Sequence, residues 1–154
     1  MSNHGLPYYK VDTDRYDDIR IKKLKKDCGA SGIAIYDYIL CQIYGGKGYY
    51  VVEDEEFVFT VAECLNVKRQ NVNEVIGYAC ATGLFDKELR TRESILTSAA
   101  IQERWVQICK KTKRSVPKID ERYWVIKKIM SADNPQMSAD NPQMSADNPQ
   151  MSAD

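Results

Sequence analysis

One segment of the sequence, Gly32–Tyr44, is apolar at almost every position around a helix. Ser31 can cap its N-terminus, and the glycine-rich run 45–48 ends it. A helix that is apolar on every side is buried on every side. In a domain this small, it must lie either at the centre of the core or in an interface between subunits. The side chains expected to self-associate in the second case are Ile35, Tyr36, Ile39, Leu40, Ile43, Tyr49 and Tyr50.

Length, composition and charge are those of an ordinary soluble globular protein. The chain has 154 residues, 44% hydrophobic and 29% charged, which is enough for one domain with a core and an appendage. The formal net charge is zero, so any attraction to nucleic acid or anionic membrane must come from a local patch. From Met130 the unit Met-Ser-Ala-Asp-Asn-Pro-Gln repeats. We predict a folded domain over residues 1–128 and a disordered repeat tail over 129–154, because each unit carries a proline and little apolar surface.

Helical patterns flank the apolar segment on both sides. A first helix opens at Asp17-Asp18 and ends at Cys28-Gly29, and Tyr49–Val52 is typical of a short strand. A helix then begins at Asp54, and after a tight turn at Asn66-Val67 another runs from about Lys68 to Thr82, where Gly83 stops it. Two amphipathic helices joined by so short a turn indicate a helix-turn-helix.

A β-hairpin is predicted directly after this motif. Leu84–Asp86 and Ile95–Thr97 have strand patterns, and the polar residues 87–94 between them are predicted to form a loop. Ser98 can cap a last long helix that ends before Val116-Pro117. A hairpin in this place is a wing. We therefore expect a mainly α fold with a small β-hairpin wing, a winged helix-turn-helix with extra N- and C-terminal helices.

The second helix of the motif carries candidate DNA contacts. At about 100° per residue, with Val72 inward, its outer side holds Gln70, Asn71 and Asn73, which can hydrogen-bond to base edges. Lys68 and Arg69 lie in the first turn, where phosphates approach such helices. Glu74, Gly77 and Ala81 on the same side suit packing against another helix better than reading a groove. Both interpretations stay open.

The C-terminal part of the predicted domain is basic. Residues 99–128 hold nine basic and three acidic residues, a balance that favours phosphate binding with little dependence on sequence and strong dependence on salt. An ordinary solvated surface is the alternative. The candidate contacts are Lys110, Lys111, Lys113 and Arg114, with Arg90 and Arg92 from the wing.

Several classes of function are not supported by the residues. The five cysteines are spread without a Cys-x-x-Cys pair and the one histidine is His4, so we predict no metal site and no cofactor. The run 45–48 lacks the spacing of a phosphate-binding loop, and no histidine past residue 4 can act as a base, so we expect neither catalysis nor a small-molecule substrate. No signal peptide or membrane helix is apparent, which predicts a cytoplasmic protein without membrane contact.

Several runs of the sequence carry a family resemblance. They are Pro7–Asp12, Asp17–Leu24, Gly29–Tyr36, Gly83–Asp86, Ile95–Ser98 and Ile101–Trp105. Over roughly residues 6–126 the chain resembles a winged-helix family common in phage and integrated elements of Firmicutes and Bacteroidetes. That family is similar to the N-terminal domain of DnaD-type replication initiators.

The resemblance implies a DNA-associated protein acting in replication initiation or its control. Its partners would be DNA, a second copy of the chain or a replication protein. The alternative is a self-association or protein-docking module without direct DNA binding. DnaD-type N-terminal domains mainly self-associate, and the repeat stands here where their DNA-binding C-terminal domain would follow. The resemblance brings no catalytic residue with it.

Overall fold

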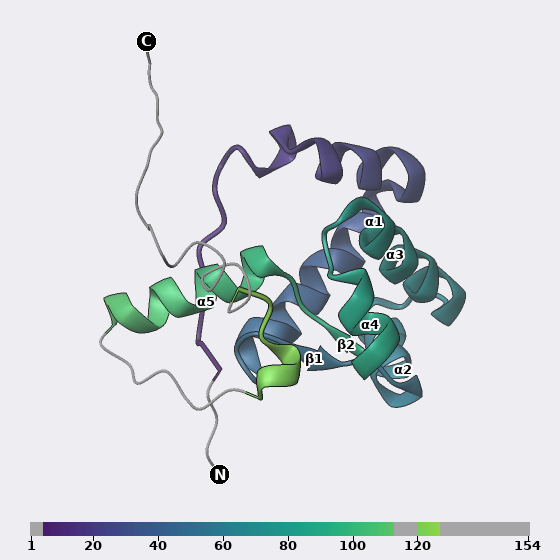
Figure 1. Cartoon of the computed structure of the whole chain (residues 1–154). Coiled ribbons are helices and arrows are strands. Elements are labelled where there is room, and N and C mark those ends of the chain that lie inside the picture. Colours follow the sequence, from purple (N-terminus) through teal and green to yellow (C-terminus); the bar gives the residue numbers. More distant parts are fainter. Residues whose placement is uncertain (1–4, 113–119, 127–154) are drawn as a thin grey trace. The chain divides into compact units, whose positions relative to one another are not determined.

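The computed structural model describes residues 5–112 and 120–126 (Figure 1). The described residues up to Tyr123 form one compact unit. The elements in chain order are the 3-10 helix η1 (Arg15–Asp17), α1 (Ile19–Gly45), β1 (Val51–Val52), α2 (Glu55–Leu65), α3 (Arg69–Thr82), α4 (Lys87–Glu93), β2 (Ile95–Leu96), α5 (Ala99–Lys111) and the 3-10 helix η2 (Glu121–Tyr123). The described residues are thus mainly helical with a small two-stranded sheet, as predicted, and the repeat tail lies outside them.

Helix α1 consists of two segments that meet at Gly29. The Asp18 side chain accepts a hydrogen bond from the Arg20 amide and caps the first segment. Gly29 has φ 73° and ψ −173°, a backbone conformation that residues other than glycine rarely adopt. It interrupts the helix where the sequence predicts an end. The second segment is the apolar helix of the sequence. Its isoleucines at 35, 39 and 43 are fully buried, so it is the central helix of the core.

Helices α2 and α3 confirm the predicted pair of helices. The Asp54 side chain accepts a hydrogen bond from the Phe57 amide and starts α2. Asn66, in the left-handed conformation, ends it, and α3 follows after two further residues. The predicted apolar stripe of α3, including Val72 and Ile76, is buried, and α3 packs along α1. The turn chemistry and the apolar period in the sequence agree here, so both helices lie close to their predicted bounds.

The predicted hairpin is wrong. Residues 87–93 form α4 in place of a loop, and β2 pairs with β1 in antiparallel register, Val51 opposite Leu96, rather than with residues 84–86. One hydrogen bond, from the Asp86 amide to the Thr97 carbonyl at 2.7 Å, joins the two predicted strands.

Helix α4 has clear local causes. The Asp86 side chain accepts a hydrogen bond from the Leu89 amide, which caps the helix, and Leu89 itself is buried. Glu88 and Arg92 add an ion pair one turn apart, at 3.4 Å. A polar composition favoured a loop in the sequence, but the cap, the ion pair and one buried leucine are enough for two turns of helix.

Helix α5 closes the core. Ser98 caps it through the Ile101 amide, as predicted, and Trp105 is fully buried with its ring centroid 5.2 Å from that of Tyr49. The side-chain amide of the buried Gln102 donates to Thr97 Oγ1 at 3.2 Å and to the Tyr123 carbonyl at 2.7 Å. These bonds hold η2 against the start of α5.

Candidate functional site

The predicted DNA contacts of the helix-turn-helix lie at the start of α3. Lys68 is its N-cap residue, and Lys68, Arg69, Gln70 and Asn73 are exposed, while Asn71 is half-buried. Among the described residues, neither Lys68 nor Arg69 makes an ion pair. The Gln70 amide lies 3.5 Å from a carboxylate oxygen of Glu74. The first turn therefore presents two free cations and several amide groups to solvent.

Carboxylates lie on both sides of this helix. A shallow cavity of about 320 Å³ opens beside the first turn of α3, lined by Glu53, Asp54, Glu55, Val58, Arg69 and Asn73. On the other side, the Tyr78 hydroxyl donates a hydrogen bond to Asp27, and that bond raises the pKa of Tyr78 to about 12. Negative charge beside the exposed strip of α3 weakens the attraction of a phosphate backbone. Close contact between α3 and the base edges in a DNA groove is therefore disfavoured.

The two predicted wing arginines are not free. Arg90 donates to both carboxylate oxygens of Glu53, at 2.8 and 3.0 Å, and its side chain is 31% exposed. Arg92 pairs with Glu88 and Glu93, each at 3.4 Å. Helix α4 turns both side chains toward acids of their own chain, and their contact with DNA stays a prediction. In a bidentate pair the carboxylate neutralises the guanidinium, so little net positive charge is left to attract a phosphate.

The basic candidates of the C-terminal helix are described only in part. Lys110 and Lys111 are exposed in the last turn of α5, while Lys113 and Arg114 lie outside the described residues. The C-terminal end of α5 points away from α2 and α3 (Figure 1). The described candidates therefore form two separate pairs of cations rather than one continuous patch.

The residues predicted to self-associate lie in the core. Ile35, Ile39 and Ile43 are fully buried, and Tyr36, Leu40 and Tyr49 are at most 7% exposed. Tyr50 is half-buried, and its ring packs against Tyr49 and Tyr123. These positions are those of a core helix, because α2 and α3 pack against α1 within the same chain. The six buried side chains could reach a partner only if the core opened.

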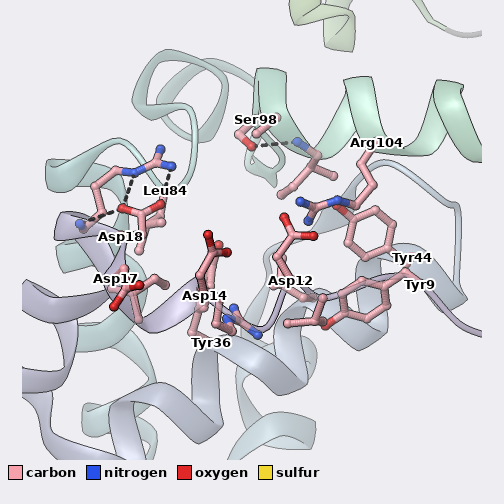
Figure 2. Close-up of a pocket in the computed structure, with 17 residues that line it drawn as sticks. Tyr9, Asp12, Asp14, Asp17, Asp18, Tyr36, Tyr44, Leu84, Ser98 and Arg104 are labelled. Carbon is pink, nitrogen blue, oxygen red and sulfur yellow. Dashed lines mark hydrogen bonds and ion pairs between the residues drawn. The ribbon is translucent and has the colours of Figure 1, made fainter.

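A larger cavity, of about 400 Å³ and not predicted from the sequence, lies beneath the N-terminal segment. Residues 9–20 cross over the second segment of α1 and the first turns of α5, and they enclose the cavity with them (Figure 2). Four of the lining residues are aspartates of the N-terminal segment: Asp12, Asp14, Asp17 and Asp18. The close spacing of these aspartates in the sequence was the one signal that could have indicated a site here. Arg104, from α5, reaches the same cavity only through the fold.

Two arginines of the N-terminal segment are held by ion pairs. Arg15 pairs with Asp37 at 2.8 Å, with its guanidinium carbon 5.8 Å from the ring centroid of Tyr36. Arg20 pairs with Asp18 at 2.9 Å, and its hydrogen bond lowers the pKa of that carboxyl. By contrast, the carboxylates of Asp12, Asp14 and Asp17 make no hydrogen bond or ion pair with any other described residue.

Two tyrosines form the aromatic wall of this cavity. Burial raises the pKa of Tyr36 to about 12. Burial also raises the pKa of Tyr44, and the positive charge of Arg104 partly offsets that rise. Tyr44 is only 1% exposed, and a side-chain hydrogen bond with Arg104 also lowers the pKa of its hydroxyl. Both hydroxyls therefore stay protonated at neutral pH.

Comparison with known proteins gives the family. The model of the family described as Lin1244/Lin1753-like, N-terminal, matches residues 8–101. The chain belongs to this family. It is also 29% identical over 113 residues to the uncharacterized phage-related protein Lin1244/Lin1753 of Listeria innocua serovar 6a, a match that covers 73% of this chain and 36% of that protein. No solved structure matches the chain.

The matched region of this Lin1244/Lin1753-like chain includes both the helix-turn-helix candidates and most of the cavity lining. None of the five cysteines forms a disulfide bond in the described part of the chain. Within residues 5–112 and 120–126 no group of histidines, cysteines and acids is arranged to hold a metal ion. Over the same residues, no helix combines the length and the apolarity that crossing a membrane requires.

Proposed function

We propose that the chain is a non-catalytic, DNA-associated protein of a phage or integrated mobile element, acting in replication initiation or its control. The observation that carries this proposal is the exposed start of α3, where Lys68 and Arg69 have no ion pair in the described part of the chain. Cations in the first turn of the second helix of such a motif lie where phosphates approach. The phage-related relative from Listeria innocua supports the mobile-element setting.

The proposal includes a winged-helix arrangement from β1 to β2. Strand β1 precedes the two helices, β2 follows them, and the two strands pair. The bond from the Asp86 amide to Thr97 brings a third extended segment beside β2. In this arrangement α4 occupies the place of a wing. It is the kind of fold expected from the similarity to DnaD-type N-terminal domains.

The DNA contacts would be to phosphates rather than to bases. Glu74 lies on the outer side of α3 and holds Gln70, and the acids at the start of α2 line one flank of the same helix. Phosphate contacts carry no sequence information by themselves. We therefore expect affinity that depends little on sequence and falls steeply with salt.

The test is DNA binding by the full chain, measured by fluorescence anisotropy on a labelled duplex over a range of salt concentrations. Lys68→Ala/Arg69→Ala should lower the slope of log affinity against log salt by about two, roughly one for each lost phosphate contact. Lys25→Ala/Lys26→Ala removes the same charge from exposed positions of α1 and serves as the control. Equal losses in both variants, or no binding by the full chain at low salt, would overturn the proposal.

Self-association without DNA binding remains the second candidate function, on a different surface from the predicted one. Four large hydrophobic residues of the N-terminal part are exposed, namely Tyr8, Val11, Tyr16 and Ile19, at 45% to 79%. Light scattering after gel filtration tests it with Tyr16→Ser/Ile19→Ser. A dimer that this variant dissociates, together with no DNA affinity in the full chain, would favour the second function over the first.

A further inference from the structure

Helix α2 carries an exposed acidic strip. Its members are an aromatic side chain and the three carboxylates that lie one turn before or after it: Phe59, Glu55, Glu56 and Glu63. Side chains three or four positions apart are neighbours on the surface of a helix, so these four share one face. Phe59 is 51% exposed, and the three glutamates make no ion pair with any other described residue. This face therefore combines unpaired negative charge with an apolar side chain.

The first segment of α1, residues 19–28, carries a basic strip with the same layout. Its members are one exposed apolar side chain and three lysines of the following two turns: Ile19, Lys22, Lys23 and Lys26. They stand at positions i, i+3, i+4 and i+7, and therefore also share one face. Ile19 is 61% exposed, and the three lysines make no ion pair in the described part of the chain. The one acid of the segment, Asp27, lies near its end and accepts a hydrogen bond from the Tyr78 hydroxyl.

The two strips match each other in layout and are opposite in charge. A single exposed apolar residue is ordinary on a protein surface, and so is a run of like charges on a helix. The same layout occurs here twice in one chain with opposite signs, one apolar side chain beside three charges. Complementary charge of this kind selects a partner and sets the register of an interface.

The fold keeps the two strips of one chain apart. Figure 1 shows the first segment of α1, in purple, and α2 on different sides of α3. Helix α2 meets α1 through the second segment instead, where the Tyr38 hydroxyl donates to Cys64 Sγ at 3.1 Å. A contact between the strips therefore requires two copies of the chain. The formal net charge of zero leaves no long-range repulsion between such copies.

We propose that copies of this chain associate through these strips, with the acidic strip of one copy against the basic strip of another. The lysine ammonium groups donate to the glutamate carboxylates, and Phe59 packs against Ile19 between them. The strips are small and exposed, so the contact is weak and depends strongly on salt. It uses neither Lys68 nor Arg69, so it does not depend on the proposed binding to DNA, and it gives the exposed Ile19 a defined counterpart.

The first test is sedimentation equilibrium of the full chain, over a range of protein and salt concentrations. We expect the average mass to rise with protein concentration at low salt and to fall back to that of one chain at high salt. A single chain at every concentration at low salt would overturn the proposal. Association that does not respond to salt would overturn it as well, because the contact would then be mainly apolar.

The second test reverses the charges of one strip at a time. Glu56→Lys/Glu63→Lys and Lys22→Glu/Lys23→Glu should each weaken self-association about tenfold or more at low salt, because like charges then face each other. The control Lys110→Glu/Lys111→Glu reverses the same number of exposed lysines at the end of α5, and should leave the affinity within about twofold. Circular dichroism establishes that each variant is folded. Equal weakening by the control would contradict a contact between defined strips.

The third test restores the complementarity. An equimolar mixture of the two reversed variants brings strips of opposite sign together again, and should associate at low salt although each variant alone does not. The chain that carries all four substitutions should also recover most of the affinity of the unsubstituted chain. Failure of both to associate would overturn the proposal. Lys68 and Arg69 are unchanged in all of these variants, so DNA binding measured on the same samples tests the two proposals separately.

Discussion

The second segment of α1 and the helix α3 pack against each other, yet they differ in how much of each is covered. Segment 32–45 of α1 buries most of its circumference, with Ile35, Ile39 and Ile43 fully buried, and leaves a strip exposed at Ala34 and Cys41. Helix α3 buries one stripe, which includes Val72 and Ile76, and leaves Gln70 exposed. The sequence makes both helices candidates for contact with a partner. Both helices leave a strip uncovered, and the strip of α3 is the one that carries the cations Lys68 and Arg69.

Apolar character alone does not separate a helix of the core from a helix of an interface. A helix that is apolar all round fits both, and the number of covering elements in the same chain decides between them. Here α3 covers one side of segment 32–45, and Tyr36 meets Phe85 on another, with ring centroids 5.6 Å apart. The chain is large enough to bury this helix without a second copy.

The strongest test of this contrast removes a buried side chain from α1. Ile39→Ala leaves a cavity where no solvent reaches, and should lower the free energy of unfolding by about 2–5 kcal/mol. Lys25→Ala, on the exposed side of the first segment, should change it by less than about 0.5 kcal/mol. Urea denaturation followed by circular dichroism measures both. A small loss for Ile39→Ala would mean that segment 32–45 is less enclosed than described here.

A second test concerns the boundary between the two segments of α1. Gly29 has a positive φ of 73°, and a Cβ there would meet no other atom within 4 Å. Gly29→Ala should therefore cost about 1–3 kcal/mol of stability through the backbone alone, with no loss of packing. The same denaturation experiment measures it, and Ala30→Gly, at the next and exposed position, is a control for altered glycine content. If Gly29→Ala stabilises the chain, α1 is a single continuous helix.

A third test changes the start of α2, which fixes the turn into α3. Asp54→Ala removes the oxygen that accepts from the Phe57 amide, and should cost about 1 kcal/mol. Asp54→Asn keeps a capping oxygen and should recover most of that loss. Because it also removes a negative charge from the cavity beside Arg69, it should raise the affinity for DNA at low salt. Lower affinity for DNA in Asp54→Asn would contradict the repulsion inferred at this flank of α3.

The sequence predicted most of the helices, because caps, glycine stops and apolar periods are local signals. Asp54, Asn66, Gly83 and Ser98 all act where their sequence context indicates. The hairpin was wrong because a polar segment can still form a short helix when a cap and one buried leucine support it. Strand pairing between residues 51 and 96 depends on contacts distant in the chain, which no local pattern specifies.

The candidate sites were less predictable than the fold, for a related reason. Lys68 and Arg69 follow from the helix boundary, and the structure leaves them exposed. Arg90 looked equally free in the sequence, but its partner Glu53 lies 37 positions away. The cavity under residues 9–20 depends on Arg104 and Tyr44 meeting the N-terminal aspartates, again across most of the chain. Charge in a sequence shows which residues could bind, and only the fold shows which ones are already paired.

The smallest expected effect on stability is also the most informative for function. Lys68→Ala/Arg69→Ala should change the free energy of unfolding by less than about 0.5 kcal/mol, because both side chains are exposed and neither makes an ion pair in the described part of the chain. Thermal unfolding followed by circular dichroism measures this change on the same samples used for DNA binding. A loss above about 1 kcal/mol would show that the first turn of α3 supports the fold. Any loss of DNA affinity in this variant would then no longer report on phosphate contacts, and α3 would resemble segment 32–45 rather than contrast with it.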